Sequence, residues 1–156
     1  MQELVVIGID PAATSGLAVF SGPHLTHSAT VKVKTARDCM AALRPFEHAD
    51  VVYIEGQWVG GTNSREGRGK AQGALKTSAK AGWWQAAAQL LGIRTVVIPV
   101  ATWRAVYKIR GGREHCKAEA IRIASQRWGI TQTDAAEAAL IGLAGYVHET
   151  QRCKNS

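Results

Sequence analysis

Four acidic residues stand at positions where the ends of secondary-structure elements could bring them together. Asp10 and Glu55 each follow a short apolar run rich in β-branched residues, which is typical of a buried strand. Asp134 and Glu137 are three residues apart in an Ala-rich segment, so they share one face of the expected helix. Carboxylates gathered in this way repel one another and usually need a cation between them.

The ligand type predicts which cation this would be. Carboxylate oxygens suit Mg²⁺ or Mn²⁺ better than zinc. Two such ions, about 3.5–4 Å apart, would activate a water molecule and stabilise the leaving oxygen of a phosphodiester. We therefore expect Asp10, Glu55, Asp134 and Glu137 to be metal ligands and catalytic residues, with two ions in one site.

Each acid also has a plain structural interpretation. Asp10 precedes Pro11 and could simply begin a turn, and Glu55 could be a solvated strand end. Asp134 and Glu137 could form a capping box, with Asp134 as the N-cap. The unbroken apolar runs before Asp10 and Glu55, and the alanines around Glu137, favour a buried cluster instead.

Composition indicates a globular chain with a polyanionic partner. The 156 residues are 46% hydrophobic, and we expect a single domain over residues 1–156. The formal net charge of +7 and the isoelectric point of about 9.7 favour nucleic acid, because each neutralised phosphate releases counterions. With no apolar run long enough to span a bilayer and no recognisable signal peptide, we expect no membrane association and a cytoplasmic location.

The elements that must position the acids alternate between strands and helices. Strands are expected over Leu4–Ile9, Leu17–Phe20, Thr26–Lys34, Val51–Ile54 and Thr95–Ile98. Helices are expected over Ala36–Phe46, Lys70–Leu91, Trp103–Tyr107, Arg113–Trp128 and Asp134–Glu149. The polar tail, residues 149–156, is expected to fray. This order predicts an α/β fold with a five-stranded mixed sheet flanked by helices.

Four short motifs then suggest a family. Ile7–Pro11 (IGIDP) and Thr14–Val19 (TSGLAV) resemble the opening of RuvC-type Holliday junction resolvases in the ribonuclease H-like superfamily. Ile54–Trp58 (IEGQW) resembles the second acidic motif of that family, and Thr133–Ala138 (TDAAEA) resembles its closing motif. Gly73–Lys76 (GALK) resembles the start of the helix used for dimerisation. The motifs occur in the family's order over almost the whole chain.

The resemblance implies a metal-dependent homodimer that makes paired nicks in four-way (Holliday) junctions or other branched DNA. It also implies that Lys117 stabilises charge on the scissile phosphate. Three features depart from the family. Glu137 stands where an Asp is usual, and the loop after Glu55 is unusually rich in Gly and Arg. The segment between Pro99 and Lys117 looks more like phage-encoded relatives. We therefore expect the protein in a bacterial cell or a phage-infected host.

Two clusters of basic residues are candidates for DNA binding, because such side chains would hold phosphates beside the acids. Their members are Arg65, Arg68, Lys70, Lys76 and Lys80 in the first, and Arg104, Lys108, Arg110 and Arg113 in the second. A merely solvated charged face is the alternative. Trp58 could stack on an unpaired base or lie in the core.

Adjacent tryptophans in the long helix predict a shared role in the core and the dimer. Trp83 and Trp84 must face different directions, so one can enter the core. The other, with Leu75, Ala79 and Ala86 at helical spacing, could bury a two-fold contact.

Three other functions stay open on the sequence. The same fold could act on flaps, forks or RNA. The segment 10–16 also resembles the phosphate loop of actin-like and sugar kinase ATPases, although those need two such domains. A junction-binding protein without catalysis is the third, and retention of all four acids argues against it.

Overall fold

The computed structural model describes residues 2–56 and 79–156 of the chain. Its strands form one sheet in the order β3-β2-β1-β4-β5. They are β1 Val5–Asp10, β2 Thr14–Ser21, β3 His24–Lys32, β4 Val51–Gly56 and β5 Arg94–Pro99. β1, β2 and β3 form an antiparallel meander, whereas β4 runs parallel to β1 and β5 parallel to β4. The predicted five-stranded mixed sheet is confirmed.

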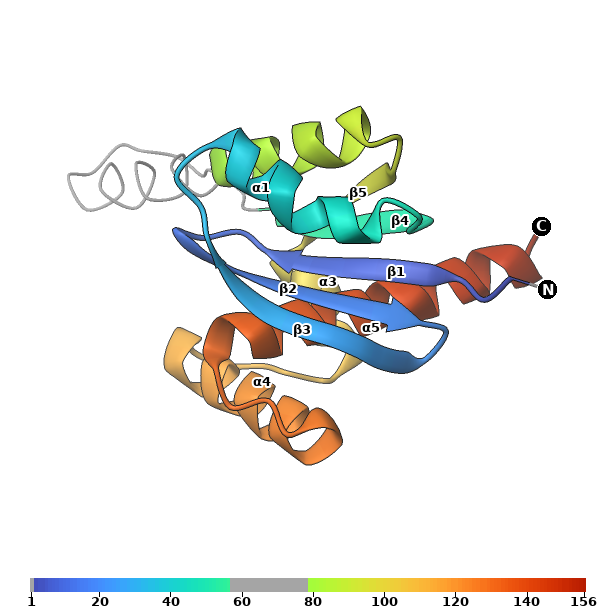
Figure 1. The fold of residues 1–156 in the computed structure, drawn as a ribbon. Helices are drawn as coiled ribbons and strands as arrows, with labels where there is room; N and C mark the ends of the chain where they lie inside the picture. Colours follow the sequence, from blue (N-terminus) through green and yellow to red (C-terminus); the bar gives the residue numbers. More distant parts are fainter. Residues whose placement is uncertain (1, 57–78) are drawn as a thin grey trace, which may run out of the picture.

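Helices cover both faces of this sheet (Figure 1). They are α1 Ala36–Leu43, α3 Val100–Val106, α4 Arg113–Trp128 and α5 Thr133–Lys154, with a further helix over residues 79–90. α1 and the helix at 79–90 lie on one face, and α3, α4 and α5 lie on the other. No helix in the described ranges combines the length and the apolar character needed to cross a membrane.

Side chains of the central strands alternate between two hydrophobic cores. Ile9 of β1 packs with Trp84 in the core beneath α1 and the helix at 79–90. Val6 of β1 and Tyr53 of β4 pack with Trp103 in the core beneath α5. Because strand side chains alternate with a period of two, the even positions of β1 and the odd positions of β4 face α5.

α5 lies unusually close to the sheet, and two glycines permit this. A Cβ on Gly8 would lie 2.2 Å from the carbonyl oxygen of Ala138, and one on Gly16 would lie 1.8 Å from the carbonyl oxygen of Asp134. Only glycine fits at such distances, so the first turns of α5 are fixed directly over β1 and β2. The alanines around Glu137 were the sequence signal for a buried cluster, and the glycines of the sheet had not been identified as part of it.

Three predicted helix boundaries differ from the structure by more than one residue, and one of them is the start of α3, which lies at Val100 rather than at Trp103. α5 continues to Lys154, so the prediction that the tail frays from residue 149 is wrong for 149–154. The physical reason is Glu149, which is buried and held by Tyr53 and Arg94. The first helix is α-helical only to Leu43 and continues as a 3-10 turn over Arg44–Phe46, which contains a proline.

Candidate active site

Asp10 and Glu55 lie side by side at the ends of two parallel strands. Ile9 of β1 pairs with Ile54 of β4, so the next residue of each strand is an acid. Both acids belong to the positions that face α5, and their exposed fractions are only 7% and 6%. The solvated-end interpretation of Glu55 is therefore wrong.

α5 brings the other two acids to the same place. Glu137 is 7% exposed, and its carboxylate is near enough to Asp10 to raise the pKa of that acid. Asp134 is half-buried one turn earlier. The N-cap of α5 is Gln132, with no side-chain capping hydrogen bond, so the capping-box interpretation of Asp134 and Glu137 is wrong.

The turn after β1 depends on a residue other than Asp10. The Ser15 hydroxyl donates to the carbonyl of Ala12 at 2.8 Å and accepts from its N–H at 3.1 Å. The same hydroxyl accepts a hydrogen bond of 3.0 Å from the indole N–H of Trp84. Ser15 thus closes the turn and ties it to the core through Trp84.

The electrostatics of the site reflect crowded negative charge. The pKa of Asp10 is raised well above its ordinary value, first by burial and then by the charges of Glu55, Glu137 and Asp134. Burial also raises the pKa of Asp134, and the ammonium of Lys117 partly offsets this. The structure therefore brings together all four acids and Lys117, which is half-buried on α4.

The donor set fits a hard divalent cation in chemistry and in charge. All four side chains offer only carboxylate oxygens, and the charges of Glu55, Glu137 and Asp134 all raise the pKa of Asp10. Within the described ranges, no three His, Cys, Asp or Glu side chains are arranged as a complete metal site. Metal binding by these acids stays a prediction.

α3 contributes two consecutive contacts to the acids. The indole Nε1–H of Trp103 donates to Oε2 of Glu55 at 2.8 Å. The guanidinium of Arg104, which the sequence suggested for DNA contact, lies 3.8 Å from Glu137. We missed Trp103 as a site residue; its only signal is that Pro99, the N-cap of α3, places it in the first turn of a helix directly after β5.

Three basic residues of the second cluster lie on the surface between α3 and the first residue of α4. Lys108, Arg110 and Arg113 are exposed. Arg113 lies one helical turn before Lys117 and so shares its face of α4. These three cations are thus accessible, as phosphate contacts would require, and Lys117 acts on Asp134.

The first basic cluster and its helix are described only in part. Lys80 lies with its ammonium 5.6 Å from the ring centroid of Trp83. Trp84 is fully buried, which confirms that one of the two tryptophans enters the core, and Trp83 is half-buried against that core. The other predicted residues lie outside the described ranges: Trp58, Arg65, Arg68, Lys70, Leu75 and Lys76.

Solved structures share this architecture. The chain superposes on T. thermophilus RuvC in complex with Holliday junction substrate with a TM-score of 0.63 and 19% identity, covering 94% of this chain and 96% of that one. A second Thermus thermophilus RuvC structure gives 0.61 at 20% identity, covering 95% and 97%. The yeast mitochondrial Holliday junction resolvase Ydc2 gives 0.57 at 12% identity, covering 99% and 86%. No family model and no curated protein matches the sequence.

These likenesses define the class of fold. The chain has the α/β ribonuclease H-like fold, as the sequence predicted. Within that class, its architecture is the one found in RuvC and in Ydc2. At such identities the likeness concerns the fold, and the activity has to be argued from the site.

Proposed function

We propose that this protein is a divalent-metal-dependent endonuclease that cuts branched DNA, four-way junctions in particular, by paired nicks from a homodimer. The observation that carries the proposal is the buried Asp10, whose carboxylate is surrounded by three further acids from β4 and α5. Such a cluster of like charges is costly for folding and is typical of a functional site.

The residues have distinct roles in this proposal. Asp10, Glu55, Asp134 and Glu137 hold Mg²⁺ or Mn²⁺, with two ions in each site. The bound metal supplies an activated water molecule and stabilises the leaving oxygen of the phosphodiester. Lys117, next to Asp134, neutralises charge on the scissile phosphate.

DNA contacts extend from the site over the neighbouring cations. The exposed side chains of Lys108, Arg110 and Arg113 hold backbone phosphates, and Lys80 and the basic residues of 57–78, which lie outside the described ranges, are further candidates for such contacts. A net charge of +7 supports a polyanionic substrate. Four-way junctions are favoured because RuvC is seen with a Holliday junction substrate and Ydc2 is a Holliday junction resolvase.

A homodimer follows from the symmetry of the substrate. Paired nicks on opposite strands need two sites related by a two-fold axis. The helix at 79–90 has the apolar surface for such a contact, with Trp83 half-buried and Leu90 77% exposed. We expect the protein to elute as a dimer at micromolar concentration.

A cleavage panel tests the proposal. Wild-type protein with Mg²⁺ or Mn²⁺ is mixed with a synthetic four-way junction, a flap, a fork, plain duplex and an RNA–DNA hybrid, and products are mapped on each strand. We expect symmetric nicks near the branch point of the junction. Cutting that ignores branching would remove the junction claim, and preferred cutting of flaps, forks or hybrids would reassign the substrate. Absence of metal-dependent cutting on every substrate would remove the nuclease claim.

A further inference from the structure

Two consecutive residues of α3 contact two different acids of the site. Trp103 hydrogen-bonds Glu55, and Arg104 lies against Glu137. We propose that Trp103 is a positioning residue that fixes the Glu55 carboxylate for metal binding, while Arg104 is a counter-cation that must leave Glu137 when the metal arrives. This inference rests on the proposed metal-dependent function.

The geometry at Trp103 suits a positioning role. Its side chain is fully buried, and its indole can only donate, so Oε2 of Glu55 is held at 2.8 Å in one orientation. The ring packs edge-on against Tyr107, at 6.5 Å between centroids, and the Tyr107 hydroxyl donates to the backbone carbonyl of Leu140 on α5. Trp103 is thereby anchored to the helix that supplies the other acids. Hydrogen bonds of this kind to a ligating group orient it for the metal.

The geometry at Arg104 suits a displaceable cation. Its closest approach to Glu137, 3.8 Å, is beyond hydrogen-bond range, so the attraction is Coulombic and does not fix the carboxylate. The side chain is 22% exposed, and its buried Nε has no hydrogen-bond partner among the described residues. Arg104 therefore compensates the negative cluster without being well satisfied itself.

A cavity beside Arg104 could accept its side chain after displacement from Glu137. Arg104 lines this open cavity of about 470 Å³, whose other walls include Val100, Ala101 and Ile109. A guanidinium displaced from Glu137 can turn into this cavity and reach solvent or a DNA phosphate. The centroid of the Trp103 ring lies 5.4 Å from the guanidinium carbon of Arg104, so a cation–π contact can stabilise the Arg104 side chain when it leaves Glu137.

The two roles predict opposite effects on metal affinity. Trp103→Phe removes the donor that orients Glu55, so Mn²⁺ should bind roughly 10- to 100-fold more weakly. Arg104→Met keeps the aliphatic stem and removes a competing positive charge, so Mn²⁺ should bind roughly threefold to tenfold more tightly. Residues that merely supported the fold would weaken binding in both variants.

Mn²⁺ titration without DNA, followed by calorimetry and by loss of the free-ion EPR signal, measures these affinities in the full chain. Trp84→Phe is the matched control, because Trp84 is an equally buried tryptophan whose N–H donates to neutral Ser15 at 3.0 Å. This control should lose stability and keep its Mn²⁺ affinity. Thermal unfolding in EDTA reports how far each variant is destabilised.

Each outcome of the titration decides something. If Trp103→Phe binds Mn²⁺ with the affinity of the wild type, the positioning role is overturned. If Arg104→Met binds Mn²⁺ more weakly than the wild type, the counter-cation role is overturned. A wild-type chain that binds no Mn²⁺ would overturn the metal-dependent function together with this inference. If Trp103→Phe does not fold, wild-type NMR decides: Mg²⁺ should shift the indole N–H resonance of Trp103 and not that of Trp84, and an unshifted Trp103 resonance would overturn the positioning role.

Discussion

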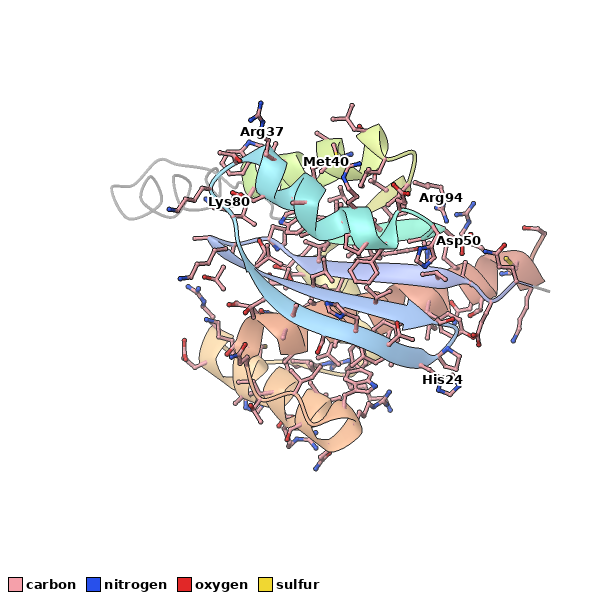
Figure 2. All side chains as sticks on the ribbon, viewed as in Figure 1. His24, Arg37, Met40, Asp50, Lys80 and Arg94 are labelled. Atoms are coloured by element: carbon pink, nitrogen blue, oxygen red, sulfur yellow. The ribbon has the colours of Figure 1, made fainter. Side chains whose placement is uncertain are left out.

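α5 carries buried carboxylates near both of its ends, and the surroundings shift carboxylate pKa values in opposite directions at the two ends. Near its C-terminus, Glu149 accepts a hydrogen bond of 2.7 Å from the Tyr53 hydroxyl and pairs with Arg94 at 2.7 Å and Arg152 at 3.5 Å. Burial acts to raise the pKa of Glu149, but the bonds from Arg94 and Tyr53 outweigh it and the pKa is lowered. Figure 2 shows Arg94 at this end of the sheet, with Lys80 toward the other.

Near its N-terminus, α5 meets Asp10, for which the described part of the chain shows no ion pair like those of Glu149. Asp10 is as buried as Glu149, at 7% and 6% exposed. Its surroundings are Glu55, Glu137 and Asp134, and its pKa is raised where that of Glu149 is lowered. The difference teaches that one carboxylate stabilises the fold, whereas the other is retained against a cost in stability, as expected of a functional group.

The largest expected effect concerns the acids that meet near the N-terminus of α5. Asp10→Asn or Glu55→Gln should lower cleavage by about 10³-fold or more, because each removes a metal ligand. Junction binding should persist or tighten, since repulsion of phosphate falls. Single-turnover cleavage and gel-shift titration measure the two effects. Glu119→Gln, which changes an exposed acid paired with Arg122, serves as control and should cut normally. Normal cutting by Asp10→Asn would show that Asp10 is not a functional acid and so does not differ from Glu149 in that respect.

At the compensated end the same kind of change should act on stability instead. Glu149→Gln leaves Arg94 and Tyr53 without the carboxylate, and unfolding free energy should fall by about 1–3 kcal/mol, a range reduced for the partial exposure of Arg94. Chemical denaturation measures the loss, and cleavage below the unfolding transition should stay near wild type. Strong loss of cleavage in a folded variant would show that this end also serves the reaction.

Asp10→Asn should also make the metal-free protein more stable at neutral pH. Because the folded pKa of Asp10 lies above its ordinary value of 3.8, the folded state binds its proton more tightly than the unfolded state. In the wild type, this tighter proton binding stabilises the folded state at low pH, and the stabilisation is lost as pH rises through the raised pKa. Asp10→Asn has no carboxyl group to titrate, so it does not lose stability in this way. Thermal melts in EDTA at a series of values from about pH 4 to about pH 8 give the melting temperature of each protein as a function of pH. The wild-type and Asp10→Asn curves should separate at the upper end of this range. Coinciding curves would mean that Asp10 is not destabilising.

The smallest expected effect tests how the compensation is divided. Arg152 is 58% exposed and lies 3.5 Å from Glu149, so Arg152→Gln should cost no more than about 0.5 kcal/mol. Differential scanning calorimetry beside Glu149→Gln makes the comparison. A loss as large as that of Glu149→Gln would identify Arg152, rather than Arg94 and Tyr53, as the main partner.

Part of the candidate site, the approach of Asp10 to Glu55, could be predicted from local sequence pattern. Asp10 and Glu55 follow apolar strands, and parallel strands end at the same edge of a sheet, so their approach follows from sequence order alone. Trp103 and Arg104 were not readable in this way. Their contacts with Glu55 and Glu137 join residues 48 and 33 positions apart in the chain, and no local periodicity reports such pairs.

The sequence by itself determined the order of strands and helices, the acids at the strand ends and the sharing of a helix face by Asp134 and Glu137, because these depend on neighbours along the chain. Only the tertiary structure decided that Asp134 and Glu137 serve a buried cluster rather than a helix cap. It also decided that the chain beyond Glu149 is helical. The physical reason is the same in both cases: burial and the partners of a charge come from segments distant in sequence, and these outweigh local preference.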